Sequence, residues 1–293
     1  MGRAAVATIL GSPGGNPGAR VRAGRYRGAV EIEGEILAHY ALGAEHSRLT
    51  AGPSLELLRT QLLLERFLPR PPARVLDVGG GPGVYASWLA GRGYQVHLID
   101  PVPLHLEQAA AAGGFTVAHG DARALAEPAD SYDAALLLGP LYHLTERADR
   151  LAALAGACRA VRSGGIVAAA GISRYASTFD GFFRGFLDKP GFAVMMTEDL
   201  RTGQHRNPTG HPEFFTTAYF HDPDGIAAEV TESGLRLRAV LPVEGPLHWA
   251  PGIQDRLANP AQRDLILRTL AAMEGDPAIA GATAHLLAVG QRP

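Results

Sequence analysis

The sequence predicts an α/β fold in which helices cover both faces of a seven-stranded mixed sheet. From residue 74 onward, short apolar segments alternate with helical ones, and repeated strand–helix units build parallel sheets. The segment 132–138 is apolar almost throughout, as expected for a strand that is covered on both faces. The chain has 293 residues, of which 46% are hydrophobic, enough to bury a core of this kind.

The order of the elements follows from hydrophobic periodicity and from glycine and proline breaks. The expected strands are 74–78, 94–99, 115–118, 132–138, 166–170, 235–243 and 285–289, the last of them antiparallel at the far side of the sheet. The expected helices are 84–90, 103–112, one that begins near Thr145, 222–233 and 253–273.

Three regions are distinguished along the chain. Residues 1–25 are rich in Gly, Ala and Arg and are expected to form a flexible extension. Residues 26–70 have apolar residues at helical spacing and predict an N-terminal helical cap. Residues 71–293 form the main domain, with an aromatic-rich insertion at about 174–219, directly after the fifth strand. That position predicts a lid over a ligand site, or a packed surface subdomain, or both.

Composition excludes several classes of function. The formal net charge of −2 provides no basic field for a phosphate backbone, so we expect no nucleic-acid partner. No run of about 18 apolar residues is present, so we expect no membrane span. The only cysteine, Cys158, cannot form an internal disulfide, which fits the cytoplasm. No histidine or acidic cluster has the spacing of metal ligands, and the oligomeric state is left open.

A glycine-rich loop follows the first strand and is the main functional signal. It comprises Asp77, Gly79, Gly80, Gly81 and Gly83. Glycines let the backbone turn sharply and approach a ligand closely. A dinucleotide fingerprint needs a third glycine where this chain has valine, and no Lys-Ser/Thr pair follows as in a phosphate-binding loop.

The pattern Asp-x-Gly-x-Gly-x-Gly after a first strand resembles the first signature of class I S-adenosylmethionine-dependent methyltransferases, which have a Rossmann-like fold. The resemblance covers residues 74–165 closely and the rest of the chain loosely. It implies S-adenosylmethionine as the cofactor and a methyltransferase domain over residues 71–293. The cofactor's chemistry agrees, because backbone N–H groups can meet its carboxylate and Asp77 can favour its ammonium.

Other strand ends extend the expected cofactor site. Asp100, followed by Pro101, closes the second strand, where a carboxylate can accept hydrogen bonds from a ribose diol. The resemblance implies that Asp121 and Ala122 read the adenine edge and that Leu138 lies against the methionine moiety. Tyr40 in the cap is expected either to cover the cofactor or simply to pack.

The sequence gives fewer signals for the methyl-acceptor site than for the cofactor site. His143 is the candidate general base and Tyr142 its neighbour, because both follow the fourth strand; the alternatives for His143 are a helix cap or a contact to the cofactor. Glu45, Arg48 and Arg59 are expected either to face the pocket as part of the cap, where Arg59 would bind an anionic group of the substrate, or to lie on a solvated helix face.

The expected reaction is methyl transfer to an oxygen or nitrogen of a small, natural-product-like molecule. A carbon acceptor is the alternative within this class. Base methylation of nucleic acids is disfavoured, because the turn 139–142 lacks the amide or carboxylate that such enzymes carry there. Two alternatives from other classes are a non-catalytic S-adenosylmethionine-binding module and a nicotinamide-dependent oxidoreductase.

Overall fold

The computed structural model of the chain describes residues 34, 36, 52–211 and 213–293. The expected extension 1–25, most of the cap before residue 52, and Tyr40, Glu45 and Arg48 lie outside the described residues. Within them, no helix has both the length and the apolar composition required to cross a bilayer.

One mixed sheet forms the centre of the molecule. Its strands are β1 (Arg74–Val78), β2 (Gln95–Asp100), β3 (Thr116–His119), β4 (Tyr132–Leu137), β5 (Val161–Ser173), β6 (Gln204–His205), β7 (Ala218–His221), β8 (Arg236–Pro242) and β9 (His285–Gln291). The order β3-β2-β1-β4-β5 is parallel. β9 pairs antiparallel with β5 on one side and with β8 on the other.

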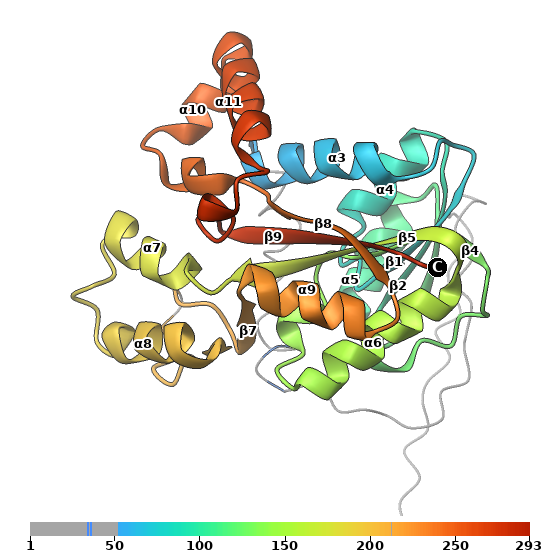
Figure 1. Cartoon of the computed structure of the whole chain (residues 1–293), viewed down its shortest axis with the longest axis horizontal. Helices are drawn as coiled ribbons and strands as arrows, with labels where there is room; N and C mark the ends of the chain where they lie inside the picture. The colour runs from blue at the N-terminus through green and yellow to red at the C-terminus, as the bar shows by residue number, and fades with distance from the viewer. Residues whose placement is uncertain (1–33, 35, 37–51, 212) are drawn as a thin grey trace, which may run out of the picture.

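Helices cover both faces of the sheet (Figure 1). They are α3 (Leu55–Phe67), α4 (Val84–Gly91), α5 (Pro103–Ala112), α6 (Arg147–Ala160), α7 (Ala176–Arg184), α8 (Phe192–Thr202), α9 (Pro223–Glu232), α10 (Ile253–Ala258) and α11 (Pro260–Met273). Alternate strand residues point to opposite faces. Val75 therefore packs with α3, α4 and α5, whereas Leu76 packs with α6 and α9.

The mixed α/β class with helices on both faces is confirmed, but the strand number and the place of the last strand are corrected. The sheet has nine strands among the described residues, because β6 and β7 of the insertion join it. β5 extends beyond β4, and its end pairs with β7 through Ile172 and Phe220. The last strand is antiparallel as expected, yet it lies between β5 and β8 rather than at the edge.

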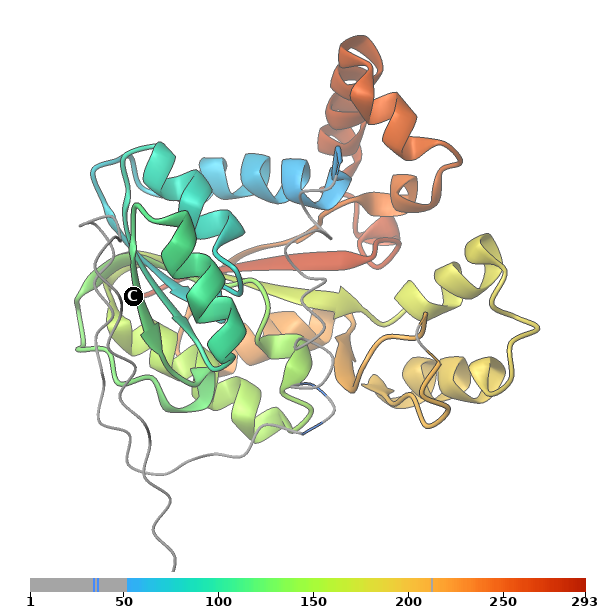
Figure 2. The ribbon, with the colours of Figure 1, turned by 180° about the vertical axis from the view of Figure 1, so that it is seen from behind.

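The insertion after β5 is a small packed unit. Its helices α7 and α8 project beyond the sheet in Figure 2, where they are drawn in yellow. Phe186, Phe192, Met195 and Phe214 form its own buried cluster. The expected helix 253–273 is divided into α10 and α11, because Pro260 follows Asn259, whose side chain caps α11.

Candidate functional site

The glycine loop between β1 and α4 adopts the backbone that its sequence requires. Gly79, Gly81 and Gly83, at every second position, have φ values of +64°, +57° and +86°. Residues with a Cβ rarely adopt this region. Gly80 is needed for a different reason: a Cβ there would lie 2.6 Å from Oδ2 of Asp77. Each glycine of the motif therefore has a local structural cause.

Asp100, at the end of β2, holds this loop by hydrogen bonds. Its Oδ2 accepts a hydrogen bond from the Gly81 N–H (2.9 Å), and its Oδ1 accepts one from the Val102 N–H (2.8 Å). His105 Nδ1 lies 3.2 Å from the same Oδ1. A carboxylate has about four acceptor positions, so Asp100 can also accept hydrogen bonds from a ligand hydroxyl.

Asp77, at the start of the loop, is a buried carboxyl suited to a cationic ligand. Only 1% of the residue is exposed. Burial, and secondly the neighbouring charge of Asp100, raise its pKa to about 7. Its Oδ2 is buried and has no hydrogen-bond partner among the described residues. A bound ammonium group would satisfy this oxygen and favour the ionised carboxylate.

Asp121, after β3, makes two local interactions. Its Oδ1 accepts the Arg123 N–H at 2.9 Å and so caps a short 3-10 helix, η1 (Ala122–Ala124). Its carboxylate also pairs with the Arg123 guanidinium, with Nη2 2.6 Å from Oδ2. This ion pair raises the pKa of Arg123 and fixes the carboxylate at the cavity wall.

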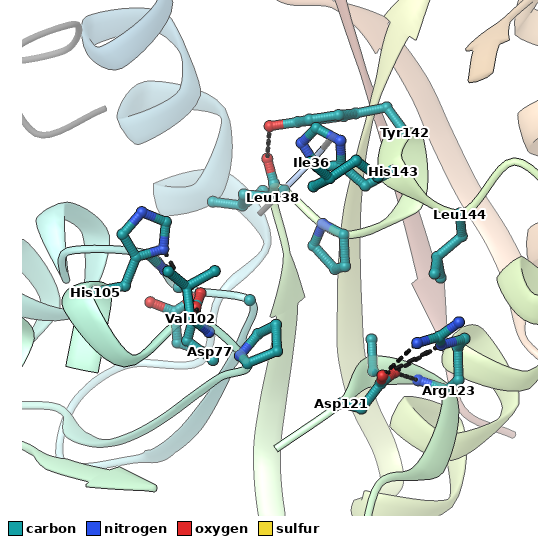
Figure 3. Close-up of a pocket in the computed structure, with 18 of the residues that line it drawn as sticks. Ile36, Asp77, Val102, His105, Asp121, Arg123, Leu138, Tyr142, His143 and Leu144 are labelled. Carbon is teal, nitrogen blue, oxygen red and sulfur yellow. Dashed lines mark hydrogen bonds and ion pairs between the residues drawn. The ribbon is translucent and has the colours of Figure 1, made fainter. Parts of the chain in front are cut away.

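These residues surround a first cavity of about 260 Å³ at the carboxyl ends of β1, β2 and β4. Figure 3 shows Asp77 and His105 on one side, Asp121 and Arg123 on the other, and Tyr142 and His143 at one end. The predicted site residues that line it are Asp77, Gly79, Gly80, Gly81, Asp100, Pro101, Asp121, Ala122, Leu138, Tyr142 and His143. Gly83 does not line it; Gly83 is the N-cap residue of α4 and lies next to Phe115.

Tyr142 and His143 lie on a 3-10 helix, η2 (Leu141–His143), after β4. The Tyr142 hydroxyl donates to the Leu138 carbonyl at 3.4 Å. Its ring meets the imidazole of His143 edge-on, with centroids 4.7 Å apart, and the Phe215 ring of the insertion lies 5.7 Å from that imidazole. The insertion therefore contacts the residues at the end of the first cavity.

A second cavity of about 280 Å³ lies beside the first, under the insertion. Its apolar wall comprises Ile172, Phe186, Phe192, Met195, Phe214, Phe215 and Phe220, and its polar wall includes Asp180, His248 and His285. Tyr142 and Glu56 line both cavities. The two spaces are therefore neighbours with a shared wall.

The structure corrects the expectation for Arg59. This residue lines neither cavity. Its side chain is buried, donates from Nε to the Val243 carbonyl (3.0 Å) and pairs through Nη2 with Glu274 Oε2 (2.6 Å). The carboxylate of Glu274 neutralises the charge of the buried guanidinium, so Arg59 joins α3 to the C-terminal segments rather than contacting a substrate.

Several lining residues were not predicted. His105, five residues after Asp100, and Arg123, two after Asp121, follow strand ends and could have been found from that spacing. Glu56 and Ile36 belong to the cap region, and their place depends on how it packs on the sheet. No local pattern in the sequence indicates that contact.

Comparisons with known proteins find similarity over the part of the chain that contains most of this site. Residues 75–165 match the family model of a methyltransferase domain. A ubiquinone biosynthesis O-methyltransferase from Methylocella silvestris is 33% identical over 145 residues, which are 47% of this chain and 55% of the relative. This chain thus spans about half the length of that curated relative.

Solved structures agree on the fold. An S-adenosylmethionine-dependent methyltransferase from Mesorhizobium loti has a TM-score of 0.53 and 19% identity, over 82% of this chain and 100% of the other. A methyltransferase in complex with the Haloferax volcanii Trm112 activator has a TM-score of 0.57 and 15% identity, over 90% of this chain and 100% of the other. At such identities the likeness concerns the fold, which is Rossmann-like as expected.

Proposed function

Because residues 75–165 match a methyltransferase domain and the fold is that of S-adenosylmethionine-dependent methyltransferases, we propose that this chain transfers a methyl group from S-adenosylmethionine to an oxygen of a small molecule. The observation that carries the proposal is the pair of neighbouring cavities, one at the glycine loop and one under the insertion, which share Tyr142 and Glu56. Methyl transfer needs two reactants side by side, away from water.

The first cavity fits the cofactor. The buried Asp77 Oδ2, which lacks a hydrogen-bond partner among the described residues, suits the ammonium group of the methionine moiety. Asp100 suits the ribose hydroxyls, and Asp121 with Ala122 suits the adenine edge. When bound, S-adenosylmethionine supplies an electrophilic methyl group on a positively charged sulfur. Leu138 and Tyr142 are then the residues that exclude water beside it.

The second cavity suits the acceptor. Its aromatic rings and Met195 match a molecule with an aromatic or apolar body. Oxygen is favoured as the methylated atom because the relative from Methylocella silvestris is named as an O-methyltransferase. Nitrogen and carbon are the alternative methylated atoms, and a natural product is a candidate for the acceptor molecule. His143 lines only the first cavity, so its role as a base stays a prediction.

Calorimetric titration with S-adenosylhomocysteine tests the cofactor site. We expect saturable binding that Asp100→Asn weakens about tenfold to a hundredfold, since a hydrogen bond to a charged group contributes roughly 1.5–3 kcal/mol. Asp224→Asn, which changes an exposed carboxylate on α9, is the matched control and should bind normally. A folded protein that binds NADH instead would overturn the proposal in favour of an oxidoreductase.

Turnover separates an enzyme from a binding module. The protein is incubated with S-adenosylmethionine and, separately, with phenols, amines and 1,3-dicarbonyl compounds. We expect S-adenosylhomocysteine and a methyl ether to form with phenols. Binding of the cofactor without product from any acceptor would instead favour the non-catalytic module.

A further inference from the structure

Glu244 and His285 form a buried pair at the ligand-binding edge of the sheet. Glu244 follows β8 and His285 begins β9. Both β8 and β5 run antiparallel to β9, so the end of β8 and the start of β9 lie at the same edge as the carboxyl end of β5. Ligands of open α/β sheets bind at that edge.

The carboxylate of Glu244 fixes the orientation of the His285 imidazole by hydrogen bonds. Its Oε1 is 2.6 Å from His285 Nδ1, and its Oε2 accepts the His285 backbone N–H (3.0 Å) and the Thr283 hydroxyl (3.1 Å). Glu244 is fully buried. Burial raises its pKa, but the charge and hydrogen bonds of His285 outweigh burial and lower the pKa to about 2. It is therefore a carboxylate throughout the neutral range.

This arrangement determines which nitrogen of the His285 imidazole is basic. An Nδ1–H that donates to a carboxylate leaves Nε2 as the basic atom of the neutral imidazole. His285 lines the second cavity, whereas His143 does not. Glu56 reaches the same place from α3, and one ligand atom each of Glu56, Glu244 and His285 lies within 4.8 Å of the others.

We propose that His285, oriented by Glu244, is the general base that deprotonates a phenolic acceptor in the second cavity. This inference rests on the proposed function. The acceptor hydroxyl gives its proton to Nε2 of His285 while its oxygen forms the bond to the methyl carbon. The carbon–sulfur bond breaks and its electron pair stays on sulfur. A methyl ether leaves, and His285 returns the proton to solvent.

The charges around His285 favour this proton transfer. Glu244 from the end of β8 and Glu56 from α3 are both acidic and stabilise the imidazolium that forms. His248, on the 3-10 helix η3 (Gly245–Trp249), is the other titratable group on this wall that acts on Glu244. Glu244 is a positioning residue, because its hydrogen bonds are to the imidazole and backbone N–H of His285 and to the Thr283 hydroxyl.

Binding of 4-nitrophenol tests the assignment, because its anion is yellow. In the complex with S-adenosylhomocysteine, we expect the wild-type protein to lower the pKa of the bound phenol by about one unit, which is a tenfold change in the ionisation ratio. His285→Gln and Glu244→Gln should lose that shift. His97→Gln, outside both cavities, is the matched control and should keep it.

Unchanged affinity for S-adenosylhomocysteine shows that each variant is folded and separates the two proposals. If the cofactor binds but the phenol fails to bind, or titrates alike in wild type and His285→Gln, the base assignment is overturned while the cofactor site stands. If the colour shift disappears with EDTA and returns with Mg²⁺ or Mn²⁺, Glu56, Glu244 and His285 hold a metal, and the base assignment is again overturned.

Discussion

Arg150 on α6 and Glu229 on α9 form a buried ion pair, with Nη2 2.8 Å from Oε1. The guanidinium also donates from Nη1 to the carbonyls of Leu144 (2.8 Å) and Thr145 (2.9 Å) and lies 3.6 Å from the centroid of the Tyr219 ring. His221 Nε2 is 3.1 Å from Glu229 Oε2. One carboxylate therefore links α6, α9 and β7, the strand that carries the insertion to the sheet.

Glu229→Gln should destabilise the protein strongly, because it leaves the buried Arg150 without a counter-charge. We expect a loss of about 3–5 kcal/mol in the free energy of unfolding. Glu232→Gln removes the exposed partner of Arg147 and should cost less than about 1 kcal/mol. Urea unfolding at neutral pH measures both. Equal midpoints for the two variants would show that the buried pair contributes no more than the exposed one.

Cofactor binding should release a proton through Asp77. Its pKa of about 7 means that the ligand-free carboxyl is largely protonated below pH 7, whereas a bound ammonium favours the carboxylate. Affinity for S-adenosylhomocysteine should therefore rise from about pH 5.5 to about pH 7.5. Calorimetry in two buffers of different ionisation enthalpy counts the proton. Asp77→Asn should abolish this pH dependence; its persistence would assign the proton to another group.

The raised pKa of Asp77 also makes the free energy of unfolding depend on pH. Between the ordinary value of 3.8 and about 7, the folded protein retains a proton on Asp77 that the unfolded chain loses. The contribution of Asp77 to the free energy of unfolding therefore falls as the pH rises through that window.

Gly83→Ala should damage the cofactor loop. A Cβ at Gly83, with its φ of +86°, would lie 2.8 Å from Phe115 Cζ. Strain of this kind costs about 1–3 kcal/mol, and the affinity for S-adenosylhomocysteine should fall with it. Gly91→Ala, within α4 and with open space around it, is the matched control and should be neutral or stabilising. Thermal unfolding and calorimetry distinguish them; equal behaviour would contradict the strain argument.

Arg59→Met should affect stability and leave binding intact. The substitution removes the hydrogen bond to Val243 and the ion pair with Glu274, a loss of about 1–3 kcal/mol. Arg66→Met removes the exposed partner of the same glutamate and should cost less than about 1 kcal/mol. The dissociation constant of 4-nitrophenol should stay unchanged in both. A selective loss of phenol affinity in Arg59→Met would restore its substrate-binding role.

The sequence predicted best those features whose causes are local. The helix 103–112 was expected with the bounds that α5 has, because Pro103 begins it and Gly113 ends it. The glycine loop is contiguous, so its pattern could be read directly. The break at Pro260 was a local signal as well, but the periodicity of 253–273 obscured it.

The features that the sequence could not show depend on pairing between distant segments. β6 and β7 have two and four residues, and they join the sheet because β5 extends beyond β4. Glu244 and His285 are 41 residues apart and meet only because β8 pairs with β9. The roles of Tyr142, His143 and the cofactor-site residues remain predictions.

The place of β9 has a consequence for how the chain is made. The ribosome releases β5 and β8 before β9, although β9 must enter between them. Until it does, the facing edges of both strands expose unpaired N–H and C=O groups, which can pair with another chain. Nascent chains that stall before residue 285 should therefore be the form of this protein most prone to aggregate and most dependent on chaperones.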